Sequence, residues 1–519
     1  MTAPTDRPRA SVEESIEELP ELQPLEGPNE ALRDHVHPRD WENPTPSGRY
    51  NLVVLGGGTA GLVAAAGAAG LGAKVALVEK HLLGGDCLVT GCVPSKALIR
   101  SARAAADARR AERLGVQTGE VTVDFPALME RMRARRADIA RHDAAQRFKD
   151  LGVDVYLGEG RFRSPSSLEV DGRTLDFARA VVATGARAAV PPIPGIEEAD
   201  ILTNQSLFSL TELPGSLVVV GGGPIGVEMA QAFARFGSRV TLIEAGERIM
   251  GRDDERAASI VAAAMRRDGV ELRLSSEVAR LERSGERTRV LLETAAGGDT
   301  IEATHVLLAA GRAPNVAGIG LDEAGVKHDP QLGVHVDDRL RSTNPRIFAA
   351  GDVASRHRFT HAADFLARTV LRNALFFGRA RASNLVIPWA TYTDPEVAHV
   401  GLTEAEAKAR GIDHSVIEID LEDNDRAVLE AETEGFVKVL HDRRGRVLGG
   451  TIVAAHAGEM IGELTAALQN GTSLGAMASV VHPYPTVADA IRRAGDAYNR
   501  TRLTPGKAKL LSRLLRWRR

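Results

Sequence analysis

Cys87 and Cys92 are the only cysteines in a chain of 519 residues, and four residues separate them in the segment GGDCLVTGCVPSK. Pro94 suits the first turn of a helix, which would place Cys92 at the helix N-terminus. The helix dipole lowers the pKa of a thiol there, and a disulfide that exchanges with a substrate needs such a thiol. Two buried, inert cysteines are the alternative for an arbitrary pair. Because these two follow a nucleotide-binding pattern, we predict a redox-active pair.

That pattern is Gly56-x-Gly58-x-x-Gly61, which stands between the strand pattern NLVVL and a helix pattern of small residues. The glycines permit a tight turn, close approach of the backbone to a pyrophosphate, and close packing of helix on strand. The N-terminus of the helix attracts the negative charge. Glu79 ends the next strand pattern, KVALVE, where it can accept hydrogen bonds from a ribose. Together these features predict a dinucleotide site, although a glycine motif alone is weak evidence.

A second copy of the unit predicts a second dinucleotide site. Gly221-x-Gly223-x-x-Gly226 follows the strand pattern SLVVV, and Glu244 ends the pattern RVTLIE at the same distance after the third glycine as Glu79 does in the first copy. An acid at Glu244 repels a 2′-phosphate and favours NADH over NADPH. Arg248 is close in sequence and could offset that preference.

Composition excludes several classes of protein. The net charge of −4 gives no reason to expect nucleic acid as a partner, and two cysteines exclude both a disulfide-stapled scaffold and a four-thiolate metal site. The apolar run at 52–73 contains seven glycines, so we interpret it as a buried strand–turn–helix and predict no integral membrane span. No basic stretch precedes an apolar one at the N-terminus, and we expect a soluble, cytoplasmic protein.

The ordered motifs resemble a known family. GGDCLVTGCVPSK, the two glycine motifs, Ala183-Thr184-Gly185, GRAPN and AAGD occur in the order of the pyridine nucleotide–disulfide oxidoreductases, from about residue 49 to 502. This family includes glutathione reductase, dihydrolipoamide dehydrogenase and mercuric ion reductase. The resemblance implies a homodimeric enzyme in which hydride passes from NAD(P)H to FAD and the reduced flavin then reduces a Cys87–Cys92 disulfide through Cys92. Cys87 is then free to attack or ligate the acceptor.

The resemblance also implies roles for individual residues. Lys96 and Glu228 match a pair beside the flavin and nicotinamide, Arg312 matches a position near the cofactors or forms a structural ion pair, and Asp86 stands where the family usually has Thr. The residues implied for FAD are Gly56, Gly58, Gly61, Glu79, Gly85, Lys96, Gly160, Thr184, Gly185, Arg312, Gly351 and Asp352. Those implied for NAD(P) are Gly221, Gly223, Gly226, Glu244 and Gly311, with no metal site in the protein.

The expected fold is α/β, with two Rossmann-like dinucleotide-binding domains and an α+β C-terminal dimerisation domain. The Pro- and Glu-rich residues 1–48 are predicted to form a mobile or loosely draped leader, in which we expect His35 and His37 to be solvated rather than bound to a metal. The basic tail, with Leu510 and Trp517 in a candidate amphipathic helix, either docks on an acidic surface or covers the domain as a frayed end, which we favour. The predicted order is a leader at 1–48, the FAD domain at 49–190, an inserted NAD(P) domain at 191–315, the return of the FAD domain at 316–384, an interface domain at 385–505 and a tail at 506–519.

The run VHPYPTVADA distinguishes groups within the family. Glutathione and lipoamide reductases carry His-Pro-Thr there, with an acid five residues after the His. Here Tyr484 takes the place of that His, Asp489 is the acid and His482 lies two residues earlier. A Tyr with a reference pKa of about 10 cannot act as an imidazole-like base near neutral pH. Mercuric ion reductases also have Tyr here, and the segment DNDRAVLEAETEGFVKV resembles theirs.

Two features of mercuric ion reductases are missing from the sequence. Those enzymes usually carry a C-terminal vicinal cysteine pair, and many have an N-terminal Cys-x-x-Cys domain, whereas this chain has neither. Three hypotheses result: a mercuric-reductase-like enzyme acting on a metal ion or small oxidant, a low-molecular-weight disulfide reductase using His482, and a flavin redox sensor. Substitution of His482 separates the first two, and slow NADH oxidation with every acceptor would identify the third.

Overall fold

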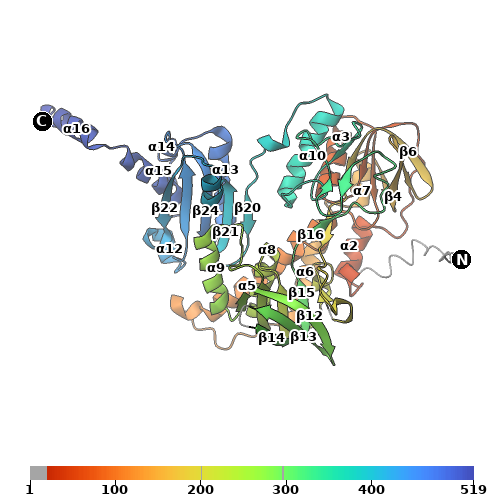
Figure 1. Cartoon of the computed structure of the whole chain (residues 1–519), viewed down its shortest axis with the longest axis horizontal. Coiled ribbons are helices and arrows are strands. Elements are labelled where there is room, and N and C mark those ends of the chain that lie inside the picture. Colours follow the sequence, from red (N-terminus) through yellow and green to blue (C-terminus); the bar gives the residue numbers. More distant parts are fainter. Residues whose placement is uncertain (1–19, 200, 295–296) are drawn as a thin grey trace.

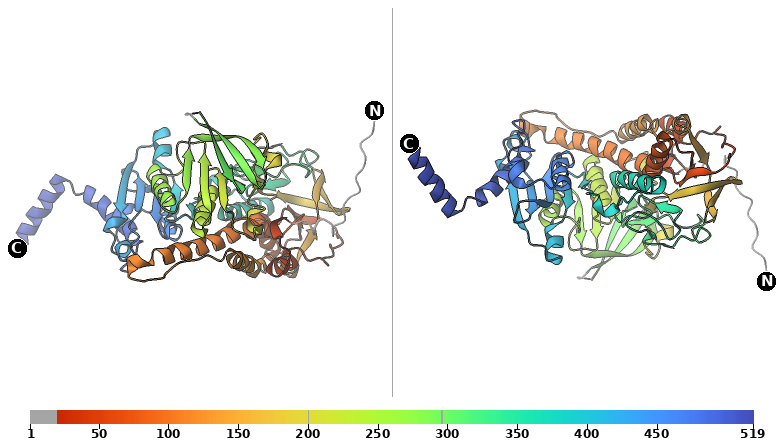
Figure 2. Two further views of the ribbon diagram at one scale, coloured as in Figure 1. Left: turned by 90° about the horizontal axis from the view of Figure 1, so that it is seen from below. Right: turned by 90° about the horizontal axis from the view of Figure 1, so that it is seen from above.

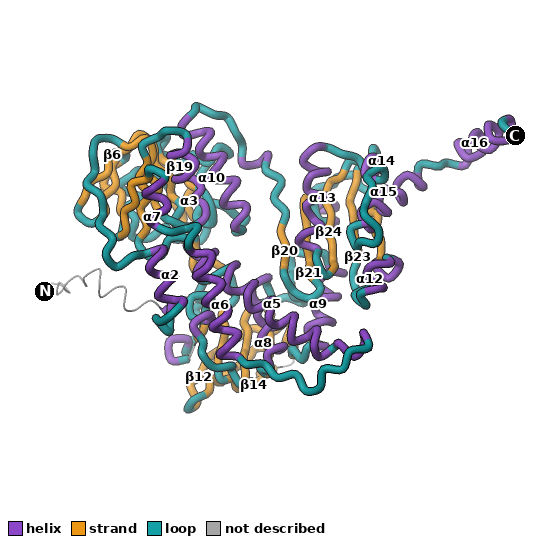
Figure 3. Tube along the Cα trace, turned by 180° about the vertical axis from the view of Figure 1, so that it is seen from behind, coloured by secondary structure: helices purple, strands orange, loops and turns teal. Residues whose placement is uncertain are grey.

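The computed structural model describes residues 20–199, 201–294 and 297–519, and within them the chain builds three main sheets with surrounding helices (Figure 1). The first and third sheets stand apart on the two sides of the molecule, and the second sheet lies below and between them (Figures 1 and 3). Each of the first two sheets contains the strand that precedes one of the two glycine motifs. The α/β fold class predicted from the sequence is confirmed.

The first sheet has the strand order β3-β2-β1-β6-β5-β4, and β19 also pairs with β6. Strands β3, β2, β1, β6 and β19 pair in parallel, and β4, β5 and β6 pair antiparallel. From Leu52 to Leu55, successive residues of β1 alternate between two different apolar cores, as a parallel strand covered on both faces requires. The elements are β1 Tyr50–Leu55, α3 Thr59–Gly70, β2 Val75–Glu79, α4 Gly85–Val89, α5 Cys92–Arg109, η2 Ala111–Leu114, α6 Phe125–Ala140, α7 Ala145–Asp150, β3 Val153–Leu157, β4 Gly160–Ser164, β5 Ser167–Val170, β6 Arg173–Val182, β19 Ile347–Ala349 and α10 Thr360–Leu375.

The second sheet is parallel throughout, in the order β11-β10-β9-β15-β8. An antiparallel meander of β12, β13 and β14 packs beside it. The chain enters and leaves this region through β7 Ala186–Ala188 and β16 Arg312–Pro314, which pair antiparallel. The elements are η3 Ile196–Glu198, β8 Ile201–Leu202, η4 Leu207–Ser209, β9 Ser216–Val220, α8 Pro224–Phe236, β10 Arg239–Glu244, α9 Glu255–Arg267, β11 Glu271–Leu274, β12 Ser276–Ser284, β13 Arg287–Thr294, β14 Gly297–Ala303 and β15 His305–Leu308.

The third sheet is antiparallel, in the order β20-β21-β24-β23-β22, and α13 packs on it. Before it comes the small pair β17 His328–Asp329 and β18 Gly333–Val334. The elements are η5 Ala382–Asn384, β20 Trp389–Thr391, β21 Glu396–Gly401, α11 Glu404–Ala409, β22 Ser415–Asp420, η6 Leu421–Asp423, α12 Asp425–Leu429, β23 Phe436–His441, β24 Val447–Ala454, α13 Ala457–Asn470, α14 Leu474–Met477, α15 Asp489–Thr501 and α16 Pro505–Trp517.

A buried ion-pair network joins the second and third sheets. Arg235 of α8 is buried, and its guanidinium bonds to Asp268 at 2.8 Å and to Asp394 at 2.7 Å. Asp394 belongs to the turn between β20 and β21, whereas Asp268 directly follows α9. The network fixes the third sheet relative to α8, which begins at the second glycine motif.

The prediction of a mobile leader is wrong for residues 20–48. This segment forms η1 Pro20–Leu22 and α2 Pro28–Val36, and Leu22, Leu32 and Val36 are fully buried in the core of the first sheet. His37 is buried rather than solvated, whereas His35 is exposed. Residues 1–19 lie outside the described residues. The Pro- and Glu-rich composition of the segment did not indicate that these three apolar side chains would be buried and hold it in place.

The C-terminal helix α16 does not cover the domain as we expected. All of its residues are described, and they extend away from the body in every view (Figures 1 and 2). Leu510, Leu514 and Trp517 are exposed. Within the described residues, no helix combines the length and apolar character needed to cross a membrane.

Candidate active site

A continuous cleft of about 4360 Å³ runs past the carboxyl ends of strands from both parallel sheets. Both glycine turns open into it, and so do the two cysteines. The predicted residues that line it are Gly56, Gly58, Glu79, Gly85, Cys87, Cys92, Lys96, Gly160, Thr184, Gly185, Gly221, Gly223, Glu228, Glu244, Gly311, Arg312, Gly351 and Asp352.

Gly61 and Gly226 stand behind the cleft and shape its turns. A Cβ on Gly61 would overlap the carbonyl oxygen of Gly56, and a Cβ on Gly226 would overlap that of Gly221. Helices α3 and α8 therefore begin directly against the strand ends. Within the described chain, no side chain caps either helix N-terminus, so the first N–H groups point to the cleft without a side-chain acceptor. Such N-termini suit a pyrophosphate.

The acids Glu79 and Glu244 are held in the same way in both units. Glu79 accepts hydrogen bonds from the N–H groups of Gly57 at 2.5 Å and His81 at 2.8 Å. Glu244 accepts them from Gly222 at 2.6 Å and Gly246 at 2.7 Å. Each carboxylate keeps lone pairs that can accept from ribose hydroxyls. The geometry of both sites fits the binding of a dinucleotide.

Cys92 is the first residue of α5 and lies beside the first residue of α10, Thr360. Cys87 and Cys92 are both free thiols in the structure, and the Thr360 hydroxyl lies 3.5 Å from the Cys92 sulfur. The hydrogen bond from the Cys87 thiol lowers the pKa of Cys92 to about 6, and Thr360 and the charge of Lys96 contribute to this lowering against the opposing effect of burial. The same hydrogen bond, together with burial, raises the pKa of Cys87. Cys92 is therefore the thiolate of the pair near neutral pH.

We expect the alkylation rate of Cys92 in the NADH-reduced enzyme to rise with pH through a midpoint of about 6, because only the thiolate is nucleophilic. Thr360→Val removes a hydrogen bond to the thiolate and should raise the midpoint by roughly half to one unit. Iodoacetamide labelling followed by peptide mass spectrometry measures both. Thr369→Val, in the same helix but bonded to the Phe365 carbonyl, is the matched control and should keep the original midpoint. An unmoved midpoint in Thr360→Val would contradict the assignment.

Lys96 and Glu228 form an ion pair next to Cys92. The ammonium of Lys96 lies 2.8 Å from Glu228, whose other oxygen accepts from the backbone N–H of Tyr392 at 2.9 Å. The Lys96 ammonium also lies 4.6 Å from the centre of the Tyr392 ring. Burial lowers the pKa of Lys96, but Glu228 outweighs it and the net shift is upward. Lys96 thus remains charged and supports the Cys92 thiolate.

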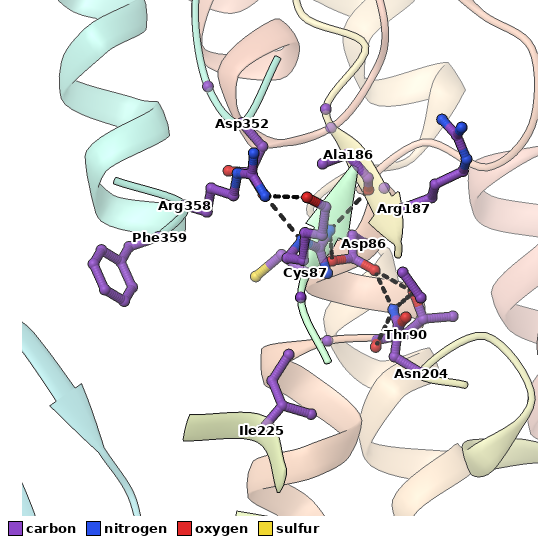
Figure 4. A pocket seen from close by; sticks show the side chains of 18 of the residues that line it. Asp86, Cys87, Thr90, Ala186, Arg187, Asn204, Ile225, Asp352, Arg358 and Phe359 are labelled. Carbon is purple, nitrogen blue, oxygen red and sulfur yellow. Dashed lines mark hydrogen bonds and ion pairs between the residues drawn. The ribbon is translucent and has the colours of Figure 1, made fainter. Parts of the chain in front are cut away.

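Arg312 forms the structural ion pair that the sequence left open as an alternative to a cofactor contact. Its guanidinium lies 2.6 Å from Asp86 and 3.4 Å from Asp352. Asp86 also accepts from Thr90 at 2.6 Å and from Asn204 at 2.8 Å (Figure 4). Burial raises the pKa of Asp352, and Arg312 opposes that shift. The network neutralises Asp86 next to Cys87, on the wall where an anionic pyrophosphate would bind.

The C-terminal candidates do not lie in this cleft of the same subunit. The Tyr484 hydroxyl donates to Asp425 at 3.1 Å, and Tyr484 is 79% exposed. Both ring nitrogens of His482 meet oxygens, Glu463 at 3.0 Å and the Val480 carbonyl at 3.1 Å. Asp489 pairs with Arg492 at 2.8 Å. One subunit therefore brings the thiols and both nucleotide sites together, but not these residues.

Three residues that the fold brings to the site carry no signal in the sequence. Thr360 and Tyr392 lie hundreds of positions from Cys92 and Lys96 in the chain, and Asn204 lies far from Asp86. None of them belongs to a glycine motif or to the cysteine segment. Only tertiary packing, which brings α10 and the segments after β8 and β20 to the cleft, identifies them.

Comparisons with known proteins agree with this geometry. A family model described as pyridine nucleotide-disulphide oxidoreductase matches residues 50–365, and a model of that family's dimerisation domain matches residues 387–494. A mercuric reductase of Streptomyces lividans is 34% identical over 460 residues, covering 86% of this chain and 96% of the relative. A dihydrolipoyl dehydrogenase of Bacillus subtilis (strain 168) is 33% identical over 453 residues, with coverages of 86% and 96%.

Solved structures give the same result. The HOCl-induced flavoprotein disulfide reductase RclA from Escherichia coli superposes with a TM-score of 0.77 at 28% identity, covering 86% of this chain and 99% of RclA. LpdA from Mycobacterium tuberculosis superposes with a TM-score of 0.78 at 29% identity, with the same coverages.

Proposed function

The chain belongs to the pyridine nucleotide-disulphide oxidoreductase family, and we propose that it passes electrons from NADH through FAD and the Cys87–Cys92 pair to a metal ion or another small oxidant. FAD and NAD(P)H are typical of the family. The observation that carries the proposal is the thiol pair in the cleft, with a stabilised Cys92 thiolate, combined with Tyr484 in place of a catalytic His.

The first nucleotide unit is the site proposed for FAD and the second for the nicotinamide nucleotide. When bound, FAD would accept a hydride and supply the electron pair that reduces the disulfide. Gly56, Gly58 and the α3 N-terminus would hold its pyrophosphate, and Glu79 its ribose. Gly221, Gly223 and Glu244 would do the same for the second nucleotide. Lys96, paired with Glu228, would keep a positive charge beside Cys92 in the cleft.

The two cysteines divide the work after reduction. Cys92 keeps the negative charge, and Cys87 donates a hydrogen bond to it. Because the pKa of Cys87 is raised, Cys87 must lose a proton before it can act as a nucleophile. A disulfide substrate therefore calls for a base at the site. A thiophilic metal ion displaces the proton by coordination and needs no base.

We propose that a second subunit completes the site. The family's dimerisation domain spans residues 387–494, and Val481 (92% exposed) and Tyr484 lie uncovered on it. Large apolar side chains this exposed are typical of a surface that a partner covers. In a homodimer, Tyr484 of the partner subunit would approach the Cys87 side of the cleft and offer a phenol rather than an imidazole.

A metal-ion acceptor would be bound mainly by the two sulfurs. Among the described residues, no group of three or more His, Cys, Asp and Glu side chains is arranged to hold a metal ion. Soft thiolates suit a soft ion such as Hg(II). Tyr484 could complete the coordination without acid–base work.

NADH is the proposed electron donor. Glu244 faces the second nucleotide site, and the Arg248 guanidinium is occupied by the backbone carbonyls of Asp253 at 3.0 Å and Gly251 at 2.9 Å. Those contacts engage donor groups of Arg248 that a 2′-phosphate would otherwise use, which supports the preference for NADH.

The test is steady-state nucleotide oxidation by the purified yellow enzyme with Hg(II) in excess thiol, with Cu(II), and with low-molecular-weight disulfides, using NADH and NADPH in parallel. We expect turnover with a metal ion and kcat/KM at least about tenfold higher for NADH. Turnover restricted to disulfides would overturn the acceptor assignment. A preference for NADPH would overturn the donor assignment.

A disulfide reductase is the second candidate, favoured by the contact of His482 with Glu463 at 3.0 Å. A carboxylate that orients an imidazole is a common arrangement for a general base. Under this alternative His482→Ala abolishes disulfide turnover, whereas metal-ion turnover is indifferent to it.

A further inference from the structure

The segment that precedes the matched family region is built into the first nucleotide site. The family model begins at residue 50, yet the described residues 20–49 pack closely on the first sheet. Residues 37–45 of this segment contribute to the lining of the cleft, among them His37, Trp41 and Asn43. They follow α2, which is seen below the first sheet in Figure 1.

A buried arginine anchors the start of the segment. Arg136 of α6 is fully buried, and its guanidinium donates to Asn29 at 2.7 Å and to the Val89 carbonyl at 2.6 Å. Asn29 in turn donates to the carbonyls of Leu22 and Pro24, both at 2.9 Å. Burial lowers the pKa of Arg136 to about 10, so the guanidinium stays charged at neutral pH. This anchor holds α2 against α6.

The following residues cap an edge strand. β3 is the outermost strand of the first sheet, and an uncovered edge would leave its backbone groups without protein partners. Trp41 donates its indole N–H to the Val155 carbonyl at 3.2 Å. Asn43 donates to the Leu157 carbonyl at 2.9 Å and accepts from the Leu157 N–H at 2.7 Å. The amide of Asn43 therefore pairs with β3 as another strand would.

Two contacts of the segment, one from Asn43 and one from His37, lie on either side of Glu79, the acid of the first nucleotide site. Leu157, clamped by Asn43, is the register partner of Glu79 in the parallel pair β2–β3. On the other side, His37 hydrogen-bonds the carbonyl of His81, whose own N–H donates to the Glu79 carboxylate. The segment thus holds the two stretches of backbone that flank this carboxylate.

An ion pair closes the same side of the site. The imidazole of His81 lies 3.3 Å from Glu21, which is buried. Burial lowers the pKa of His81, but the hydrogen bond and charge of Glu21 outweigh it and the net shift is upward. Glu21 of the segment therefore also contacts the side chain of His81, which lies two residues after Glu79 and lines the cleft.

We propose that residues 37–45 form the outer wall of the first dinucleotide site and tighten its hold on the adenosine end of FAD. The inference rests on the proposed placement of FAD at Glu79. The wall acts by fixing the backbone around Glu79 before the ligand arrives, which lowers the entropy cost of binding. Trp41 and Asn43 are positioning residues in this arrangement.

The test is titration of the full-length apoprotein with FAD, followed by the change in flavin fluorescence. Asn43→Ala should weaken FAD binding by about tenfold or more. Asn344→Ala is the matched control, because Asn344 also joins backbone carbonyls, at 3.0 Å and 2.8 Å, and is buried in the same half of the fold outside the cleft. It should destabilise the protein and leave the affinity for FAD unchanged.

A second measurement distinguishes an effect on the affinity for FAD from an effect on protein stability alone. The increase in Tm that saturating FAD produces reports affinity for the folded state. This increase should shrink in Asn43→Ala and in Trp41→Phe, which loses the indole donor but keeps an aromatic ring, and stay at the wild-type value in Asn344→Ala. Equal increases in all four proteins, or weakened binding in the control as well, would overturn the proposal. Wild-type protein that does not bind FAD would instead refute the proposed function.

Discussion

Cys92→Ser is expected to lower acceptor-dependent NADH oxidation on the order of 10³-fold, because it removes the thiolate through which the electron pair leaves the flavin. Reduction of the flavin itself should persist, since both glycine turns and the Lys96–Glu228 pair are untouched. Rapid-mixing measurement of flavin bleaching by NADH under anaerobic conditions, alongside steady-state turnover, separates the two steps.

Cys87→Ser is the matched comparison for this variant. It should lose acceptor turnover to a similar extent. Cys92 remains, however, and the serine hydroxyl introduced at position 87 can still donate a hydrogen bond to it. Alkylation of Cys92 in Cys87→Ser should therefore still increase through mildly acidic pH. Full turnover in either variant would mean that electrons pass directly from flavin to acceptor, and the dithiol mechanism would be wrong.

Lys96→Met should destabilise the enzyme by about 2–3 kcal/mol, somewhat less than the roughly 3–5 kcal/mol for a fully buried pair. Glu228 is 5% exposed and would lose its only cationic partner among the described residues, keeping the Tyr392 N–H. The side chain of Lys96 is 34% exposed, so solvent offsets some of the loss. Urea unfolding of the holoenzyme, followed through its first transition, measures the change.

The double variant Lys96→Met/Glu228→Gln provides the control. It removes both charges, so it should recover some of the stability lost in Lys96→Met, and the double-mutant cycle gives the coupling energy. The pKa of Cys92 should rise in Lys96→Met, because the charge of Lys96 contributes to the lowered value, and it should rise less in the double variant, because the charge of Glu228 acts in the opposite direction. Glu228→Gln alone completes the cycle, and a double variant whose destabilisation equals the sum of those of the two single variants would show that the two side chains are not coupled.

The local features of the site could be predicted from the sequence. The glycine turns, Glu79 and Glu244 at the strand ends, and Cys92 at the start of a helix all depend on residues within one strand–turn–helix unit. Periodicity and turn chemistry decide such features. The two units repeat the same hydrogen bonds because they repeat the same spacing.

The features that depend on distant contacts could not be predicted. Asn43 reaches Leu157 and Trp41 reaches Val155 across more than a hundred residues, and composition suggested the opposite for the leader. Arg312 matched a cofactor position and an ion pair equally well until Asp86 was found beside it. Thr360 meets Cys92 only because α10 returns to the first sheet. Tyr484, His482 and Asp489 contact residues outside the cleft, so sequence motifs alone could not place them in it.

The late return of β19 to the first sheet has a consequence for synthesis on the ribosome. β19 pairs with β6 at Ala180–Val182, but the whole second sheet is translated between these two strands. At roughly 5–20 residues per second, this interval lasts about 10–30 s. During that time the second sheet, which is continuous in sequence, can fold, whereas the first lacks β19 and α10. The second nucleotide site can therefore form before the first is complete, so that a ligand of the first site would enter a protein whose second site already exists.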